Sequence, residues 1–336
     1  MRLIKLILPV CVALSATLIA QTPPDFTPDP PDLENPTEAP PDLDPGDAPD
    51  IDVGDIPNVG DKLQAVSTRA FVSPGAGVLI NGFIIEGSGT KTVVLRGLGP
   101  SFQSSDIPNV IDDPMITLLR LNSAGTAFDT VTSNDNWETG ITAAQRTVLE
   151  DNDFVPTNSA EAAIVIDLEA GVYAIQLSGQ GEDDGAGLAE VYDFDIFSDS
   201  VLTALSTRVF AGTASDTLIG GFIIAGTEAK RVVVRATGPS FQSADIPDVL
   251  EDPSLLIYRF NTTTNLFEAV DGATNDNWGD LSAADRQYLA DNDFTPSNAS
   301  ESALVLTLEP GTYGAQVTGV GGTTGIALME VYDFED

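Results

Sequence analysis

The sequence predicts an all-β protein with two tandem antiparallel β-sandwich domains of jelly-roll or immunoglobulin-like form, each carrying one short helix. Three observations predict this class. A long block of sequence occurs twice, each copy holds seven or eight short runs rich in Val, Ile, Leu and aromatic residues, and glycine and polar turns separate the runs. Runs of this composition favour strands, and many short strands at regular spacing are typical of β-sandwiches.

The repeat is visible in six motifs, each of which returns after about 140 residues. Because the units of solenoid proteins are only about 20–50 residues long, this period indicates two whole domains. We expect the first domain at 63–197 and the second at 198–336. The paired motifs are STR at 67–69 and 206–208, GFII at 82–85 and 221–224, GPSFQS at 99–104 and 238–243, NDNW at 134–137 and 275–278, DNDF at 151–154 and 291–294, and EVYDF at 190–194 and 330–334.

Within each copy, the pattern changes from strand to helix only once. Between the NDNW and DNDF motifs lies ITAAQRTVLED, in which Thr142 and Gln145 have the spacing of a capping box, and Ser282 opens the matching helix LSAADRQYLAD. The strand candidates of the first copy are 78–87, 90–99, 115–122, 127–132, 162–171, 172–179 and 187–194.

The N-terminal residues have the pattern of export. Arg2 and Lys5 precede an apolar run over 6–19, and small residues at Ala16 and Ala20 offer cleavage points, so 1–20 is predicted to be a signal peptide. Residues 21–62 alternate proline with acids and have few apolar side chains, which predicts an extended, solvated linker. We therefore expect a secreted protein, extracellular or at the cell surface, with no membrane insertion after signal cleavage.

The composition excludes several kinds of chemistry. The chain has no histidine, and its one cysteine, Cys11, lies in the predicted signal peptide. A serine–histidine–aspartate triad, a histidine-ligated metal and an internal disulfide are thereby excluded. The formal net charge of -37 repels nucleic acid and attracts cations, so we expect no nucleic-acid partner.

The acidic turns are the candidate metal sites. Asp and Asn oxygens alternate in the NDNW and DNDF motifs of both copies, and Ca²⁺ prefers six to eight such oxygens at about 2.3–2.6 Å. The other interpretation is structural, because Asp and Asn are common in turns and at helix ends for backbone reasons. The candidate Ca²⁺ ligands are Asn134, Asp135, Asp151, Asp153, Asn275, Asp276, Asp291 and Asp293.

Three further features have a functional and a structural interpretation. The acidic patch 182–184 belongs to the first copy alone and predicts either a site or a solvated hairpin tip. Trp137 and Trp278 are expected to anchor the core, the alternative being sugar stacking. The scarce arginines are expected to pair with nearby carboxylates, and such pairs contribute little where they are exposed; the alternative is capture of a ligand carboxylate or sulfate. These arginines are Arg69, Arg96, Arg208 and Arg235.

Nearly all the chain after Leu63 resembles a repeat found in secreted proteins of environmental bacteria, Verrucomicrobia and their neighbours especially. The second copy carries the resemblance at 218–224, 235–240, 275–278 and 310–333; the first follows it less closely, with EDDGAGLA in place of GGTTGIAL. The second half of the repeat is also similar to bacterial pre-peptidase C-terminal domains, which are calcium-associated β-sandwiches appended to secreted enzymes. The resemblance implies an accessory or surface module and names no ligand.

Together these observations predict a secreted, non-catalytic binding or adhesion protein of the cell surface or extracellular matrix, with Ca²⁺ as the candidate stabilising ion. Its expected partners are an extracellular polysaccharide, a matrix or surface protein, or further copies of itself. The alternative is a self-assembling structural component of a matrix or surface layer. A glycoside hydrolase is more remote, because paired carboxylates would need a cleft and no insertion of that size interrupts either copy.

Overall fold

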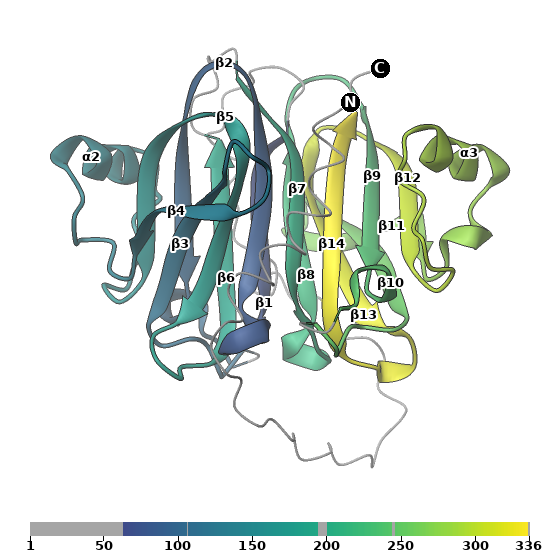
Figure 1. Ribbon diagram of the computed structural model, residues 1–336, viewed down its shortest axis with the longest axis horizontal. Coiled ribbons are helices and arrows are strands. Elements are labelled where there is room, and N and C mark those ends of the chain that lie inside the picture. The colour runs from purple at the N-terminus through teal and green to yellow at the C-terminus, as the bar shows by residue number, and fades with distance from the viewer. Residues whose placement is uncertain (1–62, 106, 194–199, 244–245, 335–336) are drawn as a thin grey trace.

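Figure 1 shows the structure, a computed structural model that describes residues 63–105, 107–193, 200–243 and 246–334. The predicted signal peptide and linker lie outside these residues. Strands make up most of the described chain, which confirms the all-β class. The strands of the first repeat are β1 (Leu63–Val72), β2 (Leu79–Leu98), β3 (Pro114–Leu121), β4 (Phe128–Asn134), β5 (Ala162–Gly179) and β6 (Gly185–Asp193). Those of the second are β7 (Val201–Ala211), β8 (Leu218–Ile224), β9 (Lys230–Thr237), β10 (Pro253–Asn261), β11 (Leu266–Asn275), β12 (Ser302–Leu308), β13 (Gly311–Gly319) and β14 (Gly325–Phe334).

Each repeat also forms the predicted helix, α2 (Ala143–Asp151) and α3 (Ala283–Asp291). The capping box at the start of α2 is confirmed, since Thr142 Oγ1 accepts the Gln145 N–H and Gln145 Oε1 accepts the Thr142 N–H. Ser282 caps α3 in the same way, by accepting the Asp285 N–H at 3.1 Å. The two helices lie at opposite ends of the long axis of the molecule (Figure 1).

Two strands of the first repeat are longer than the sequence predicts. The candidates 78–87 and 90–99 form one strand, β2, and the candidates 162–171 and 172–179 form β5. In the second repeat the same segments are separate strands, β8 with β9 and β12 with β13. Pro310 lies at the break between β12 and β13, where the first repeat has Ala170, and proline cannot donate a ladder hydrogen bond.

Strand pairing crosses from one repeat to the other. One run of paired strands is β4-β3-β5-β2-β7-β14-β9-β12, in which β2 of the first repeat pairs with β7 of the second. The other run is β5-β2-β6-β1-β8-β13-β10-β11, in which β1 pairs with β8. The long strands β2 and β5 take part in both runs. Exchanging the two repeats converts one run into the other, so the arrangement has an approximate two-fold axis.

The axis passes between β1 and β7. Phe71 pairs with Phe210, and the Oγ1 atoms of Thr68 and Thr207 are 2.9 Å apart. Each of these pairs joins residues at equivalent positions of the STR-containing strands. β1 is not among the strand candidates of the first copy, and its polar STR triplet interrupts the apolar pattern. We call the contact made by β1 with β8 and by β7 with β2 the seam.

The core is shared across the seam. A single cluster of buried apolar side chains includes Val66 and Phe83 from the first repeat and Leu205 and Phe222 from the second. Both runs of strands contribute to this cluster, since β1 belongs to one run and β7 to the other. The repeats therefore share strand pairing and an apolar core and are not joined through the connecting segment alone.

Candidate functional site

The NDNW turns use their first asparagine to hold backbone segments together. Asn134 Nδ2 donates to the carbonyl oxygens of Asn136 and Thr139, at 2.9 and 3.2 Å, and its Oδ1 accepts the Ala163 N–H at 3.0 Å. Asn275 makes matching bonds in the second repeat, at 2.9 and 3.1 Å. Both ends of each amide are thus engaged by backbone, which is the structural role that the sequence left open beside calcium binding.

The DNDF motifs form the C-terminal ends of the helices. Asn152 is the C-cap of α2 and donates to the Val148 carbonyl oxygen at 2.8 Å. Asp153 and Asp293 adopt left-handed backbone with φ of 56° and 62°, a conformation that Asp and Asn tolerate better than most residues. Asp291 Oδ1 accepts a hydrogen bond from Gln287 at 2.7 Å. These motifs therefore terminate the helices.

The structure does not gather the predicted calcium ligands into a dense carboxylate site. Within the described residues, no three or more Asp and Glu side chains come together in a way that would hold a metal ion. Backbone carbonyls and water also supply Ca²⁺ ligands in proteins, so binding itself is not tested by this observation. The calcium site stays a prediction.

In each repeat a buried glutamate, which no sequence motif points to, holds the loop that carries the GPSFQS motif. Glu161 is fully buried, and its Oε1 accepts the N–H groups of Gly99 and Ser101, both at 2.9 Å. Glu301 does the same in the second repeat for Gly238 and Ser240. A lone glutamate gives no local signal of this role, and only its recurrence in both copies could have indicated it.

The EVYDF motifs supply a second buried polar group. Arg96 Nε donates to Glu190 at 2.7 Å, and Tyr192 donates to the other Glu190 oxygen at 2.7 Å. Burial raises the pKa of Tyr192 well above its ordinary value, and the charge of Glu190 raises it further. In the second repeat Arg235 pairs with Glu330 through Nη2 at 2.5 Å. The ion pairs expected for these two arginines are confirmed. They are buried, with Glu190 only 1% exposed, so the small contribution typical of exposed pairs does not apply to them.

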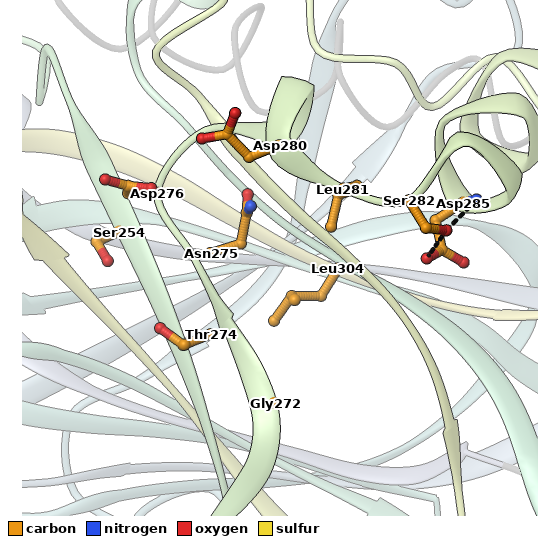
Figure 2. Close-up of a pocket in the computed structure, with 10 residues that line it drawn as sticks. All are labelled: Ser254, Gly272, Thr274, Asn275, Asp276, Asp280, Leu281, Ser282, Asp285 and Leu304. Atoms are coloured by element: carbon orange, nitrogen blue, oxygen red, sulfur yellow. Dashed lines mark hydrogen bonds between the residues drawn. The ribbon is translucent and has the colours of Figure 1, made fainter.

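Most residues of these motifs thus hold the fold, but Asn275 and Asp276 of the second NDNW motif also line a recess. A recess of about 600 Å³ opens in the second repeat between the end of β11, the start of β10 and the start of α3. Figure 2 shows Asp276 and Asp280 on one side of it and Ser282 with Asp285 on the other. Carboxylate and hydroxyl oxygens dominate the lining, and none of the lining residues is cationic. They are Ser254, Gly272, Thr274, Asn275, Asp276, Asp280, Leu281, Ser282, Asp285 and Leu304.

At the equivalent place in the first repeat, different side chains bond to one another. Met115 stands where the second repeat has Ser254, and Gln180 Nε2 lies 3.9 Å from its Sδ and donates to Asp135 at 2.8 Å. Gln145 replaces Asp285 and donates across to the Val165 carbonyl oxygen at 2.8 Å. The two repeats therefore differ at this position, and the second carries the open recess.

The first repeat has an acidic contact of its own at the patch 182–184. Asp183 Oδ2 accepts the Asp113 N–H at 3.0 Å. Burial raises the pKa of the Asp113 carboxyl above its ordinary value, and the charges of Asp135 and then Asp183 raise it further. Thr323 replaces Asp183 in the second repeat, so this concentration of negative charge belongs to the first repeat alone.

Trp137 packs in the core as expected, whereas Trp278 lies at the edge of the core of the second repeat. Trp137 is buried, with Arg146 stacked over its ring at 4.8 Å. Trp278 is half-buried, and its Nε1 donates to the Asn298 carbonyl oxygen at 3.0 Å. Trp278 also begins the short helical turn that carries Asp280 to the rim of the recess. It therefore fixes the rim through its backbone.

Comparison with models of known protein families found no match, and comparison with curated protein sequences found no significant match. The resemblance to secreted bacterial repeats therefore stays a prediction. None of the helices in the described part of the chain has the length and apolar character needed to cross a bilayer.

Proposed function

We propose that this chain is a secreted, non-catalytic binding or adhesion protein of the cell surface or extracellular matrix. Its two repeats form β-sandwiches that share the seam, and its binding site is the recess of the second repeat. The observation that carries the proposal is the difference between the repeats. In the first repeat Met115 and Gln180 take the places of Ser254 and Val320 and lie against each other, whereas the second repeat has a recess of about 600 Å³ there.

The lining favours a polyhydroxylated ligand. Asp276, Asp280 and Asp285 offer carboxylate oxygens, which accept the hydroxyl protons of sugars, and the half-buried Leu281 offers apolar surface for a ring face. Because the lining has no cation, an anionic ligand would be repelled unless Ca²⁺ bridged it to the carboxylates. An extracellular polysaccharide is therefore the proposed ligand, with Ca²⁺ as the stabilising ion.

The test fills the recess with the side chains that fill it in the first repeat. Ser254→Met with Val320→Gln copies Met115 and Gln180, while Met115→Ser alters the first repeat as the matched control. Binding is measured on a panel of bacterial and algal polysaccharides, with calorimetry on those retained. We expect the filled variant to lose at least about tenfold in affinity, equivalent to about 1.4 kcal/mol, and the control to bind as the wild type. Equal binding by all three proteins would place the site elsewhere.

Calcium is tested on the same proteins by thermal unfolding in EDTA, Ca²⁺ and Mg²⁺. A specific ion at about 100 times its Kd stabilises the folded chain by about 2.7 kcal/mol. A shift with Ca²⁺ and little with Mg²⁺ is the expected result, and equal shifts would mean screening of the negative charge alone. Release of reducing sugar that disappears on Asp276→Asn would instead favour a glycoside hydrolase.

Self-assembly into a matrix is the second candidate. Val131 on β4 and Leu266 on β11 are each 42% exposed, and within the described residues each of these strands pairs on one side only. Exposed strand edges can pair with other chains. Concentration-dependent growth in light scattering, abolished by a lysine at Val131 or Leu266, would favour this function over ligand binding.

A further inference from the structure

The centre of the seam contains a chain of three buried polar side chains. Thr68 Oγ1 lies 2.9 Å from Thr207 Oγ1, and Thr207 Oγ1 lies 2.8 Å from Asn81 Oδ1. Thr68 and Thr207 occupy equivalent positions on either side of the approximate two-fold axis, whereas Asn81 comes from the first repeat only. All three side chains are 0% exposed, so water does not complete their hydrogen bonds.

The direction of each hydrogen bond among these three side chains is fixed. Asn81 Nδ2 donates to the Ala189 carbonyl oxygen at 3.2 Å, which turns Asn81 Oδ1 toward Thr207 as an acceptor. The Thr207 hydroxyl must therefore donate to Asn81. Because its one proton is used there, the bond between the threonines is donated by Thr68. Each hydroxyl proton thus finds an acceptor, and the contact between the two threonines contains one proton.

The second repeat has glycine where the first has Asn81. Gly220 pairs with Thr68 across the seam, and a Cβ atom built at Gly220 would lie only 1.9 Å from Met329 Cε. Met329 in turn stands where the first repeat has Ala189. The repeats therefore carry two different pairs, Asn81 with Ala189 and Gly220 with Met329. The larger side chain is on β2 in the first repeat and on β14 in the second.

A seam between two like repeats could not satisfy the same atoms. With asparagine on both sides, each threonine hydroxyl can donate to its own asparagine, but the two hydroxyl oxygens then face each other with no proton between them. If one threonine donates to the other instead, the oxygen of one asparagine has no donor. With glycine on both sides, one threonine donates to the other and the second proton has no acceptor. Buried polar groups without partners are costly, so each like pairing is disfavoured by one unmatched group.

We propose that the seam is a recognition surface that selects an unlike partner, a module with glycine and methionine opposite a module with asparagine and alanine. The buried chain from Thr68 to Asn81 is its specificity determinant, in the manner of a single buried polar residue that fixes the partner in a coiled coil. The seam is self-complementary in strand register but not in hydrogen bonding. Repeats of one kind are thereby prevented from pairing with each other when chains fold side by side.

The test exchanges the matched pairs in the full chain without its predicted signal peptide. One variant makes both sides like the second repeat, by Asn81→Gly with Ala189→Met. Another makes both sides like the first, by Gly220→Asn with Met329→Ala. The control combines all four substitutions and so reverses the asymmetry while restoring the hydrogen bonds. Thermal unfolding is followed by circular dichroism.

We expect each like-sided variant to melt about 2–6 °C below the wild type, and the reversed variant to return to within about 2 °C of it. If the reversed variant stays as low as the like-sided ones, or fails to fold, or if the like-sided variants melt with the wild type, the proposal is overturned. A second measurement separates hydrogen bonding from packing. Thr68→Val with Thr207→Val should raise the melting temperature of the glycine-sided variant but lower that of the wild type, and a fall in both would contradict the proposal.

Discussion

Neutralising the buried carboxylate of Glu301 should destabilise the whole described fold. Its oxygens accept hydrogen bonds from Gly238 N, Ser240 N, Ser240 Oγ and Asn298 N at 3.0, 2.8, 2.6 and 3.3 Å, and the side chain is 0% exposed. In Glu301→Gln, the new amide group opposes the Asn298 N–H, which costs about 1–2 kcal/mol, and the three remaining bonds become neutral, which costs about 1 kcal/mol more. The total is about 2–3 kcal/mol.

The assay is thermal unfolding against Glu309→Gln, an exposed position in the same repeat with the same change of charge. For a unit of this size the loss corresponds to a melting temperature lower by about 4–12 °C. Amide exchange of Gly238 and Ser240 should accelerate in the Glu301 variant alone. If Glu301→Gln melts within about 1 °C of the control, the carboxylate does not hold the GPS loop as we have argued.

Two predictions concern pH. The raised pKa of Asp113 means that the folded chain binds the proton of this carboxyl more tightly than the unfolded chain does. Its contribution to stability is therefore present below pH 3.8 and is lost as pH rises through the folded pKa. Asp113→Asn should flatten that part of the stability–pH curve and stabilise the chain at pH 7, and a lower stability at pH 7 would contradict this. Tyr192 and Tyr332 also have raised pKa values, so their contribution to stability is lost above pH 10. Ultraviolet absorbance at alkaline pH should show that both phenols ionise only when the chain unfolds. Ionisation of all tyrosines while the chain is still folded would refute this.

The features that the sequence predicted correctly are local ones. The capping box of Thr142 and Gln145 depends on residues three apart, and most of the strand candidates depend on composition within a few residues. The repeat itself also needs no structural knowledge. These signals sufficed for the all-β class and for the position of both helices.

The features that the sequence did not predict depend on distant partners. Nothing near Ser67 or Thr68 indicates that β1 pairs with a strand of the other repeat, because the partner strand β8 is about 150 residues away in the sequence. The recess depends on several differences from the first repeat, among them Ser254 in place of Met115, and this difference acquires meaning only when Gln180 is known to lie beside that methionine. Continuity of β2 and β5 likewise depends on tertiary support that outweighs local turn signals.

The position of β1 also decides how the molecule bears mechanical load. The chain enters the described fold at Leu63, at the start of a strand that is central in its run, flanked by β6 over eight residue pairs and by β8 of the other repeat. A pull on the residues before Leu63 is applied at the end of β1, and a pull directed along this strand shears it against its two neighbours. The hydrogen bonds on both of its sides then oppose sliding simultaneously and do not open one after another. A load applied at this point is therefore resisted by strand pairs in both repeats.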